Sequence, residues 1–216
     1  MTGVERLSAR DLLEEVLDTG SWQSWDVAPQ QVAAPGSPYA RELVAAPAKA
    51  GTDESLITGQ GTLQGRPVAV VVSEFRFLAG STGHAAPVRL VLAVERATRE
   101  GLPLIGAPAS GGTRMQEGTS AFVGMVKIAA AVTAHRDAGL PYLVYLPPPT
   151  PGGVLASWGP PGHVPVAPPG PLIGLPRPPS PRAPGRRDCP HRAWRPGRRV
   201  VGHHGWRPYG CARDGP

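Results

Sequence analysis

The sequence predicts an α/β protein, and three observations lead to this fold class. Apolar runs and segments of helical periodicity alternate between residues 53 and 146, in the order strand, helix, strand, helix, strand. The strand segments are apolar throughout, which is typical of strands buried on both faces between helices. Two glycine pairs, at residues 111–112 and 152–153, each follow such a strand. The length of 216 residues fits one domain of this type with appendages.

The first 49 residues are predicted to form an N-terminal helix and an extended arm. The helix covers residues 8–19, where Ser8 and Asp11 form a capping box and Gly20 ends the helix. Its apolar stripe consists of Leu12, Leu13, Val16 and Leu17. Residues 21–49 are rich in Pro, Ala and Gln, and we interpret them as a surface arm.

Residues 50–174 are predicted to form the folded domain. It opens with two strands around a glycine-containing turn in residues 55–75, of which the second is the buried run Val68–Val72. Two helices are expected after it, at Val88–Thr98 and at Phe122–His135. Gly101 ends the first helix, and Gly139 and Pro141 end the second. Each helix is followed by a strand, at Leu102–Ala107 and at Tyr142–Leu146.

Residues 175–216 differ from the rest of the chain in composition and charge. They hold ten of the 22 basic residues but only Asp188 and Asp214 among the acids, a net charge of +8. The preceding residues therefore carry a net charge of −2. Because this tail has no apolar periodicity and few aliphatic residues, we expect it to be disordered. Its charge alone would suggest nucleic-acid binding, but it offers no aromatic stacking platform.

Several classes of protein are disfavoured by what the sequence lacks. It has no run of 18 apolar residues, and its N-terminus carries acids instead of an apolar signal core, so we expect neither a membrane span nor export. Both cysteines, Cys189 and Cys211, lie in the tail without metal-binding spacing, and no metal is expected. These features indicate a reduced, cytoplasmic setting.

The glycine pairs carry the chemistry that the sequence favours. Backbone N–H groups at the start of a helix have no partner within the helix, and glycine lets a ligand approach them without a Cβ atom in the way. Such a site can hold a phosphate or an oxyanion, although neither G-x-x-x-x-G-K-[ST] nor G-x-G-x-x-G occurs. From spacing alone, a tight structural turn and an anion site remain equally good interpretations.

Other candidate residues are weaker. Glu117 is a possible general base, but in the first turn of a helix it more often complements the helix N-terminus. Arg114 can face a phosphate or pair with a carboxylate, and Ser110 lies outside any G-x-S-x-G elbow. The histidines His84, His135 and His163 are scattered without metal-ligand spacing.

The run "PASGGTRMQEGTSAFVGMVKIAAAVTAHRDAGLPYLVYL", followed by "GGVLASWG", "GHV" and "PLIG", resembles the carboxyltransferase domain of biotin-dependent acyl-CoA carboxylases. The likeness covers about residues 50–174 and is strongest to the β-type half of acetyl-CoA carboxylase carboxyltransferase, especially actinobacterial fused β/α chains. The stretch "SEFRFLAGSTG" is similar to the family's F-x-F-x-G-G-S-x-G. Carboxyltransferase subunits of malonate decarboxylase share this lineage and remain an alternative.

The resemblance implies a crotonase-like fold, a spiral of ββα units. In that family, acetyl-CoA and carboxybiotin meet between a β-type and an α-type half, where paired backbone N–H groups stabilise the enolate of the thioester and the anion left on biotin. The released biotin nitrogen takes the substrate proton, so little side-chain chemistry is needed. By position, the oxyanion donors would be Gly111, Gly112, Gly152 and Gly153. We expect the substrate to be bound by Gly80, Ser81, Ser110 and Arg114, with Arg114 and Glu117 holding the loop.

The resemblance also implies cofactor, partners and product. Biotin would be the cofactor, carried by a biotin carboxyl carrier protein and charged by a biotin carboxylase. The chain would act with an α-type half in an oligomer and make malonyl-CoA from acetyl-CoA, or carboxylate a related acyl-CoA, for fatty-acid biosynthesis. Without the α-type half, the alternative is an inactive fragment.

The sequence departs from the family pattern in three places. Ala79 stands where the family has a glycine, and the loop "LPPPTPGG" is richer in proline than the family's "R-H-P-T-T-G-G". After about residue 174 the family continues with "F-L-G-P-R-V", whereas this chain reads "LPRPPSPR". One choice of codons that encodes "LPRPPSPR" yields "FLGPRVH" when read one base later, and we take this as a hypothesis. We therefore expect a change of reading frame after about residue 174, which truncates the family domain.

Overall fold

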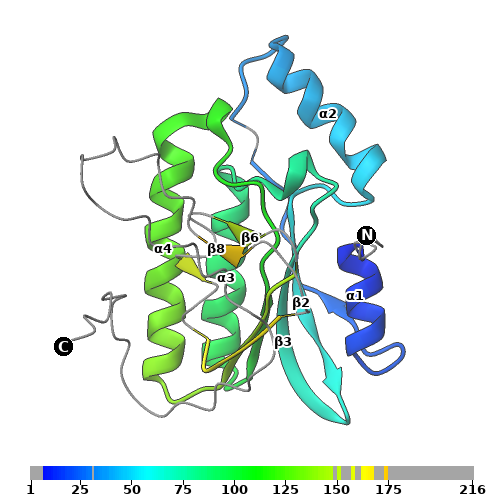
Figure 1. Cartoon of the computed structure of the whole chain (residues 1–216), viewed down its shortest axis with the longest axis vertical. Helices are drawn as coiled ribbons and strands as arrows, with labels where there is room; N and C mark the ends of the chain where they lie inside the picture. Colours follow the sequence, from blue (N-terminus) through cyan, green and yellow to red (C-terminus); the bar gives the residue numbers. More distant parts are fainter. Residues whose placement is uncertain are drawn as a thin grey trace, which may run out of the picture.

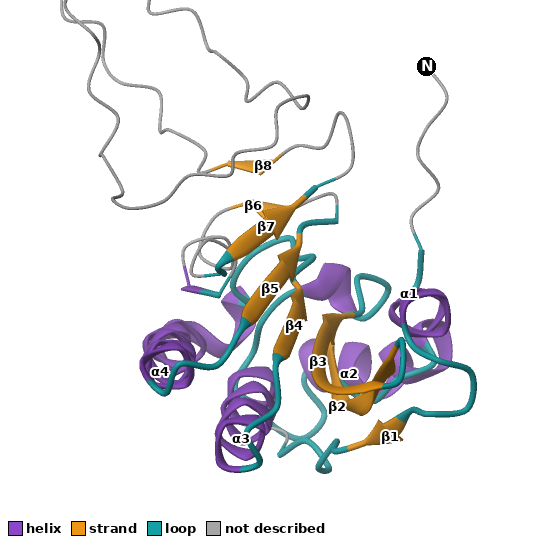
Figure 2. Ribbon diagram, turned by 90° about the horizontal axis from the view of Figure 1, so that it is seen from below, coloured by secondary structure: helices purple, strands orange, loops and turns teal. Residues whose placement is uncertain are grey.

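The computed structural model describes residues 7–30, 32–147, 150–151, 157–158, 162–167 and 173–174. A six-stranded sheet in the order β1-β2-β3-β4-β5-β7 forms its centre (Figure 2). The strands are β1 (Gln23–Ser24), β2 (Leu56–Leu63), β3 (Arg66–Ser73), β4 (Leu104–Ala107), β5 (Tyr142–Tyr145) and β7 (Val164–Val166). The first three strands pair antiparallel, and β3, β4, β5 and β7 pair parallel.

The two strands predicted around a glycine-containing turn, and the α/β alternation after them, are confirmed. Strands β2 and β3 pair from Leu56↔Ser73 to Leu63↔Arg66 and are joined by Gln64 and Gly65, whose φ angles are 52° and 74°. Positive φ at both central residues is the turn geometry that matches the twist of a two-stranded ribbon. The run Val68–Val72 is buried throughout, because helices cover both faces of this strand.

The two predicted helices pack side by side on one face of the sheet. They are α3 (Ala85–Arg99) and α4 (Gly118–Asp137), which are longer than predicted (Figure 1). The main core lies between them and the sheet and includes Val71, Leu90 and Ile128. Close helix contact depends on Gly124, because a Cβ atom there would lie 2.5 Å from the Pro87 Cγ atom. The glycine thus lets the two helices approach each other.

Helix α1 (Ala9–Val16) covers the opposite face of the hairpin, and its capping box is the predicted one. The Ser8 hydroxyl accepts from the Asp11 N–H at 3.2 Å, and the Asp11 carboxylate accepts from the Ser8 N–H at 3.0 Å. The buried carboxylate of Glu74, at the end of β3, accepts from the Ala9 N–H at 2.8 Å. Leu13 and Leu17 pack on the sheet in a second core. The helix is therefore fixed at its N-terminus and along its apolar face.

The prediction of an extended arm over residues 21–49 is wrong in its second half. Residues 38–50 form a helix, α2 (Pro38–Ala50). The Ser37 hydroxyl accepts from the Ala40 N–H at 3.1 Å as an N-cap, and Gly51 ends the helix with a φ of 72°. Pro47 lies inside the last turn, where it removes one backbone donor of the helix. Helix α2 packs over Phe77 through Leu43, Ala46 and Ala50.

A second, smaller layer gives the chain its spiral course. Residue Thr82, after β3, pairs in parallel with Thr113, after β4. Strand β6 (Thr150–Pro151), after β5, pairs in parallel with β8 (Ile173–Gly174), after β7. Each parallel strand of the main sheet is thus followed by a short segment in the second layer. After β3 and after β4, that segment leads into a helix, α3 or α4. Main strand, short segment and helix thus form a ββα unit that occurs twice.

Candidate active site

The first glycine pair lies in a loop at the end of β4, as predicted. Ser110 is completely buried, while Gly111 is exposed and Gly112 is half-buried. Gly112 has a φ of 121°, and a Cβ atom built on it would meet nothing within 4 Å. Only glycine adopts this backbone conformation without strain. The loop therefore presents bare backbone to open space, as a site for a carbonyl oxygen would require.

The N–H groups of this pair already have acceptors in the structure. The Gly111 N–H donates to the Ala79 carbonyl at 2.8 Å, and the Gly112 N–H donates to the Ser110 hydroxyl at 3.0 Å. The Ser110 hydroxyl in turn donates to the Gly112 carbonyl at 3.2 Å. A ligand oxygen at these N–H groups would have to replace the Ala79 carbonyl and the Ser110 hydroxyl.

The Ala79 carbonyl belongs to a left-handed turn, η1 (Leu78–Gly80). Its three residues have φ angles of 45°, 56° and 62°, although two of them are not glycine. Left-handed backbone costs an L-residue about 1–2 kcal/mol. The turn carries two of the predicted substrate-binding residues to the glycine loop, since Gly80 packs against the Ala109 carbonyl and Ser81 contacts Arg114. Strain of this kind is common next to functional sites.

Arg114 is buried and ties the glycine loop to the two neighbouring segments. Its guanidinium forms an ion pair with Glu54 at 2.5 Å and donates to the Ser81 carbonyl at 2.8 Å. Its backbone N–H donates to the Thr82 carbonyl at 2.9 Å. Burial disfavours the charge, but the hydrogen bond and charge of Glu54 outweigh it and raise the pKa of Arg114 above its usual range. The side chain is thus permanently charged and fully engaged.

Glu117 lies on the other side of the same guanidinium, in η2 (Met115–Glu117). It pairs with Arg114 at 3.2 Å and accepts hydrogen bonds from the Tyr39 hydroxyl and the His84 N–H. Burial, and then the hydrogen bond to Glu117, raise the pKa of Tyr39 above its usual range, so its hydroxyl keeps its proton. Through these contacts Glu117 holds Arg114, Tyr39 and the start of α3 together.

Some predicted site residues come together and others are not placed. Gly80, Ser81, Ser110, Gly111, Gly112 and Arg114 meet around the loop after β4. Gly152 and Gly153 lie outside the described residues, as does the tail 175–216, for which disorder was expected. Their assignment, and the roles of the whole set, remain predictions.

Two residues of the site were missed from sequence. Tyr39 and Glu54 reach Arg114 from 75 and 60 residues away. No local motif marks either residue, so only the folded chain brings them to the glycine loop.

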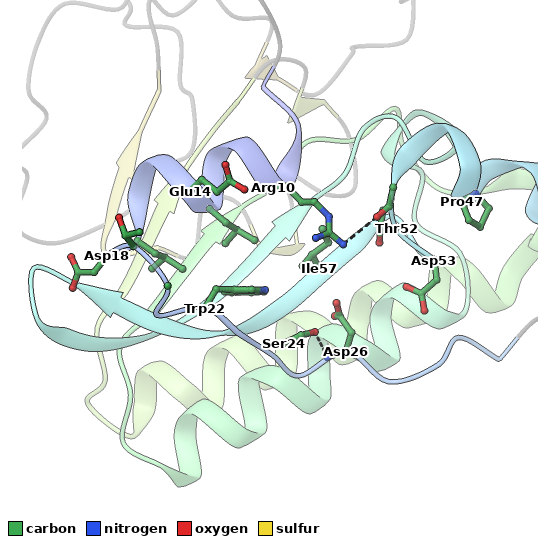
Figure 3. A pocket seen from close by; sticks show the side chains of 15 residues that line it. Arg10, Glu14, Asp18, Trp22, Ser24, Asp26, Pro47, Thr52, Asp53 and Ile57 are labelled. Atoms are coloured by element: carbon green, nitrogen blue, oxygen red, sulfur yellow. Dashed lines mark hydrogen bonds between the residues drawn. The ribbon is translucent and has the colours of Figure 1, made fainter.

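A large hollow of the described chain lies elsewhere, against the N-terminal residues (Figure 3). It has a volume of about 980 Å³ and is lined by residues of 10–57, including Arg10, Trp22 and Asp53. Three of its acids are engaged, since Asp53 pairs with Arg89 at 2.9 Å, Asp26 accepts from the Thr58 N–H at 2.8 Å and Asp18 accepts from the Gly65 N–H at 2.8 Å. The hollow therefore offers no evident chemistry, and the candidate site stays at the glycine loop.

The described residues lack two kinds of feature. They contain no helix that is both long and apolar enough to cross a membrane. They also contain no group of three or more His, Cys, Asp or Glu side chains that could hold a metal ion.

Comparison with known proteins gives consistent matches. Residues 6–175 match the model of the carboxyl transferase domain. A probable biotin-dependent acyl-coenzyme A carboxylase beta3 subunit of Mycobacterium bovis is 59% identical over 172 residues, which are 80% of this chain and 34% of that protein. The acetyl-coenzyme A carboxylase carboxyl transferase subunit beta of Synechococcus sp. (strain JA-3-3Ab) is 40% identical over 174 residues, 79% of this chain and 55% of that protein.

A solved structure, the Pseudomonas malonate decarboxylase hetero-tetramer in complex with malonate, matches with a TM-score of 0.62 and 22% identity. The match covers 80% of this chain and 63% of that one. This match supports the crotonase-like α/β fold. The chain spans between about a third and about half of the length of the curated relatives. Because the family model covers most of the chain, the protein belongs to the carboxyl transferase domain family.

Proposed function

We propose that this chain supplies the β-type half of a biotin-dependent carboxyltransferase that carboxylates acetyl-CoA to malonyl-CoA. The observation that carries the proposal is the glycine loop at the end of β4, where bare backbone faces open space. Its two N–H groups would bind a ligand oxygen once their present acceptors are displaced. Carboxyl transfer between a thioester and biotin needs this kind of site, because its main demand is stabilisation of negative charge on oxygen.

The Gly111 and Gly112 N–H groups would stabilise charge on a carbonyl oxygen, and Gly152 and Gly153 would do the same at a second position. Carboxybiotin, held by a partner protein, would supply the carboxyl group. The bare backbone at Gly112 fits a carbonyl ligand, since no atom lies within 4 Å of the missing Cβ position. The Ser110 hydroxyl can rotate away from Gly112, and the Ala79 carbonyl must leave Gly111.

A partner half is supported by the surface next to the site. Helix α4 begins just after the glycine loop and leaves large apolar side chains exposed: Phe122, Val123 and Val126 are 62%, 49% and 65% exposed. Met115, in η2, is 82% exposed. Clustered exposed apolar residues are typical of surfaces that bind another protein. We propose an α-type half as this partner, with a carrier protein and a biotin carboxylase in a cytoplasmic oligomer that serves fatty-acid biosynthesis.

A second candidate is a chain that is inactive alone. The internal hydrogen bonds of Gly111 and Gly112 favour it, because both N–H groups are occupied in the isolated chain. A malonate decarboxylase subunit is a third candidate, supported by the structural match to that enzyme.

The test is co-expression with an α-type subunit, followed by an assay for malonyl-CoA with carboxylated carrier protein and acetyl-CoA. Activity only with the partner would support the proposed half-site, and no activity with any α-type subunit would favour the inactive fragment. Release of CO₂ from a malonyl thioester, without transfer to biotin, would favour the decarboxylase.

A matched pair of glycine variants tests the site itself. Gly112→Ala should lower kcat at least tenfold, because alanine does not hold a φ of 121° and its N–H would turn away from the ligand oxygen. Loss of one oxyanion donor costs about 10²–10³ in rate. Gly139→Ala is the control, because Gly139 also has a positive φ (77°) and open space but lies at the far end of α4. Equal losses of activity in both variants would mean that backbone strain, and not the site, is responsible.

A further inference from the structure

We infer that Tyr39 is a positioning residue for the glycine loop, acting through Glu117 and Arg114. The effect of Tyr39 on catalysis rests on the proposed function, whereas its effect on the position of the glycine loop does not. Tyr39 lies in the first turn of α2, far from the loop in sequence, and its hydroxyl sits between the two charged side chains.

The Tyr39 hydroxyl has one donor and one acceptor role in this cluster. It donates to the Glu117 carboxylate and accepts from the Arg114 Nη1 atom at 3.4 Å. The aromatic ring is anchored independently, since Tyr39 packs with the α2 residues Leu43 and Ala46 against Phe77. Removal of the hydroxyl alone therefore leaves the packing of α2 in place.

The charges of the cluster explain why this hydroxyl matters. Two carboxylates, Glu54 and Glu117, share the single guanidinium of Arg114, and all three side chains are at most 4% exposed. One negative charge is thus left over in a buried setting, where it must be hydrogen-bonded. The donors that remain for Glu117 are the Tyr39 hydroxyl and the His84 N–H at the start of α3. Loss of the hydroxyl would leave the carboxylate one donor short.

A short chain of hydrogen bonds connects this cluster to the site. The Arg114 side chain and backbone hold the carbonyls of Ser81 and Thr82, at 2.8 and 2.9 Å. The Thr82 N–H then donates to the Gly112 carbonyl at 3.0 Å. A shift of Arg114 would therefore turn the Gly112 peptide and move the left-handed turn whose Ala79 carbonyl accepts from Gly111.

The experiment observes the Gly111 amide directly, in the full chain. The sequence contains a single Ser-Gly dipeptide, Ser110-Gly111, so ¹³C-carbonyl serine with ¹⁵N-glycine selects one amide signal. In Tyr39→Phe we expect this signal to shift and its solvent exchange to accelerate by about tenfold or more, as for the loss of a hydrogen bond to a charged group. Glu117→Gln should produce the same response.

Tyr145→Phe is the matched control, because Tyr145 is also half-buried but no hydrogen bond of its hydroxyl to another described residue is found. It should leave the Gly111 signal unchanged. The inference is overturned if Tyr39→Phe folds and its Gly111 amide exchanges at the wild-type rate. In the complex with an α-type half, Tyr39→Phe should lower kcat about tenfold and leave KM within about twofold, since misplacement of a catalytic group acts on the chemical step.

The two readouts separate this inference from the proposed function. A Gly111 response in a chain that is inactive with every partner would keep the positioning role and reject the carboxyltransferase proposal. Wild-type activity of Tyr39→Phe without a change at the Gly111 amide would keep the carboxyltransferase proposal and reject the positioning role.

Discussion

Ala79 is a non-glycine residue in left-handed backbone. It has a φ of 56° and a ψ of 32°, and glycine stands at this position in the family pattern. We expect Ala79→Gly to raise the free energy of unfolding by about 0.5–1 kcal/mol, because the relief of left-handed strain exceeds the added freedom of the unfolded chain. Urea denaturation measures this change.

The control for Ala79→Gly is Ala138→Gly, at an exposed position with a φ of −72°. There the substitution relieves no strain and should lower stability by about 0.5–1 kcal/mol. A loss of stability in both variants would show that the turn at Leu78–Gly80 is not strained.

His135 should make the stability of the protein depend on pH. Burial lowers its pKa from the usual 6.5, and the hydrogen bond to the Pro141 carbonyl opposes this shift only in part. The unfolded chain therefore binds a proton first as the pH falls through 6.5. We expect the free energy of unfolding to be constant above this range, to fall as the pH drops below 6.5, and to level off below the folded pKa.

Chemical denaturation between about pH 5 and pH 8, around the ordinary histidine pKa, measures this dependence. His135→Gln should be less stable, because His135 Nδ1 is hydrogen-bonded to the Thr98 hydroxyl at 2.9 Å, but its stability should change less over the same range. An equal pH dependence in the variant would assign the effect to another group.

At the scale of elements, α3 and α4 approach each other closely at Gly124. A Cβ atom at Gly124 would lie 2.5 and 2.7 Å from two carbons of the Pro87 ring. Gly124→Ala should therefore destabilise the protein by about 1–3 kcal/mol, although alanine is the better helix former. Thermal unfolding measures the loss. Thr133→Ala, exposed on the same helix, should stay within about 0.5 kcal/mol of wild type. A stable Gly124→Ala variant would mean that the helices can separate at little cost.

The elements that the sequence predicted are those with strong local signals. The capping box at Ser8, the hairpin turn and the apolar faces of α3 and α4 are properties of neighbouring residues. Helix α2 was missed because Pro47 and the Pro-rich surroundings argue against a helix, whereas its stability comes from packing on Phe77. Short strands such as β1 and β7 depend on pairing with distant segments and leave no period to detect.

For the molecule as a whole, the N-terminal residues are joined to the domain by buried contacts. Arg89, on α3, is 2% exposed and donates to the carbonyls of Val27 and Leu56 as well as to Asp53. We expect Arg89→Met to cost roughly 2–4 kcal/mol, because several acceptors lose their donor together. The arm should then become sensitive to protease between α1 and α2, which mass spectrometry of the fragments would show.

The control is Arg99→Met, at an exposed position on the same helix. It should leave the protease pattern unchanged. Resistance of Arg89→Met to cleavage would mean that the arm is held by its other contacts alone.

The division into an N-terminal helix and extended arm at residues 1–49 and a domain at residues 50–174 remains a prediction. The contacts of Arg89 join the two parts. The family match begins at residue 6, well before the predicted start of the domain. The glycine loop was predictable because its glycines are adjacent in sequence. The contacts of Tyr39 and Glu54 with Arg114 could not be predicted, because they form only when distant parts of the chain fold together.

The distance in sequence between these contacts has a consequence for folding during synthesis. Ala9 meets its acceptor Glu74 65 residues later, and Tyr39 meets Glu117 78 residues later. At about 5–20 residues per second, a ribosome needs about 4–16 s to add 78 residues. Throughout that interval the Tyr39 hydroxyl lacks its Glu117 partner, although Phe77, on which α2 packs, is made earlier. The hydrogen bond between Tyr39 and Glu117 can therefore form only if the Tyr39 hydroxyl, made seconds earlier, has no other partner when Glu117 appears.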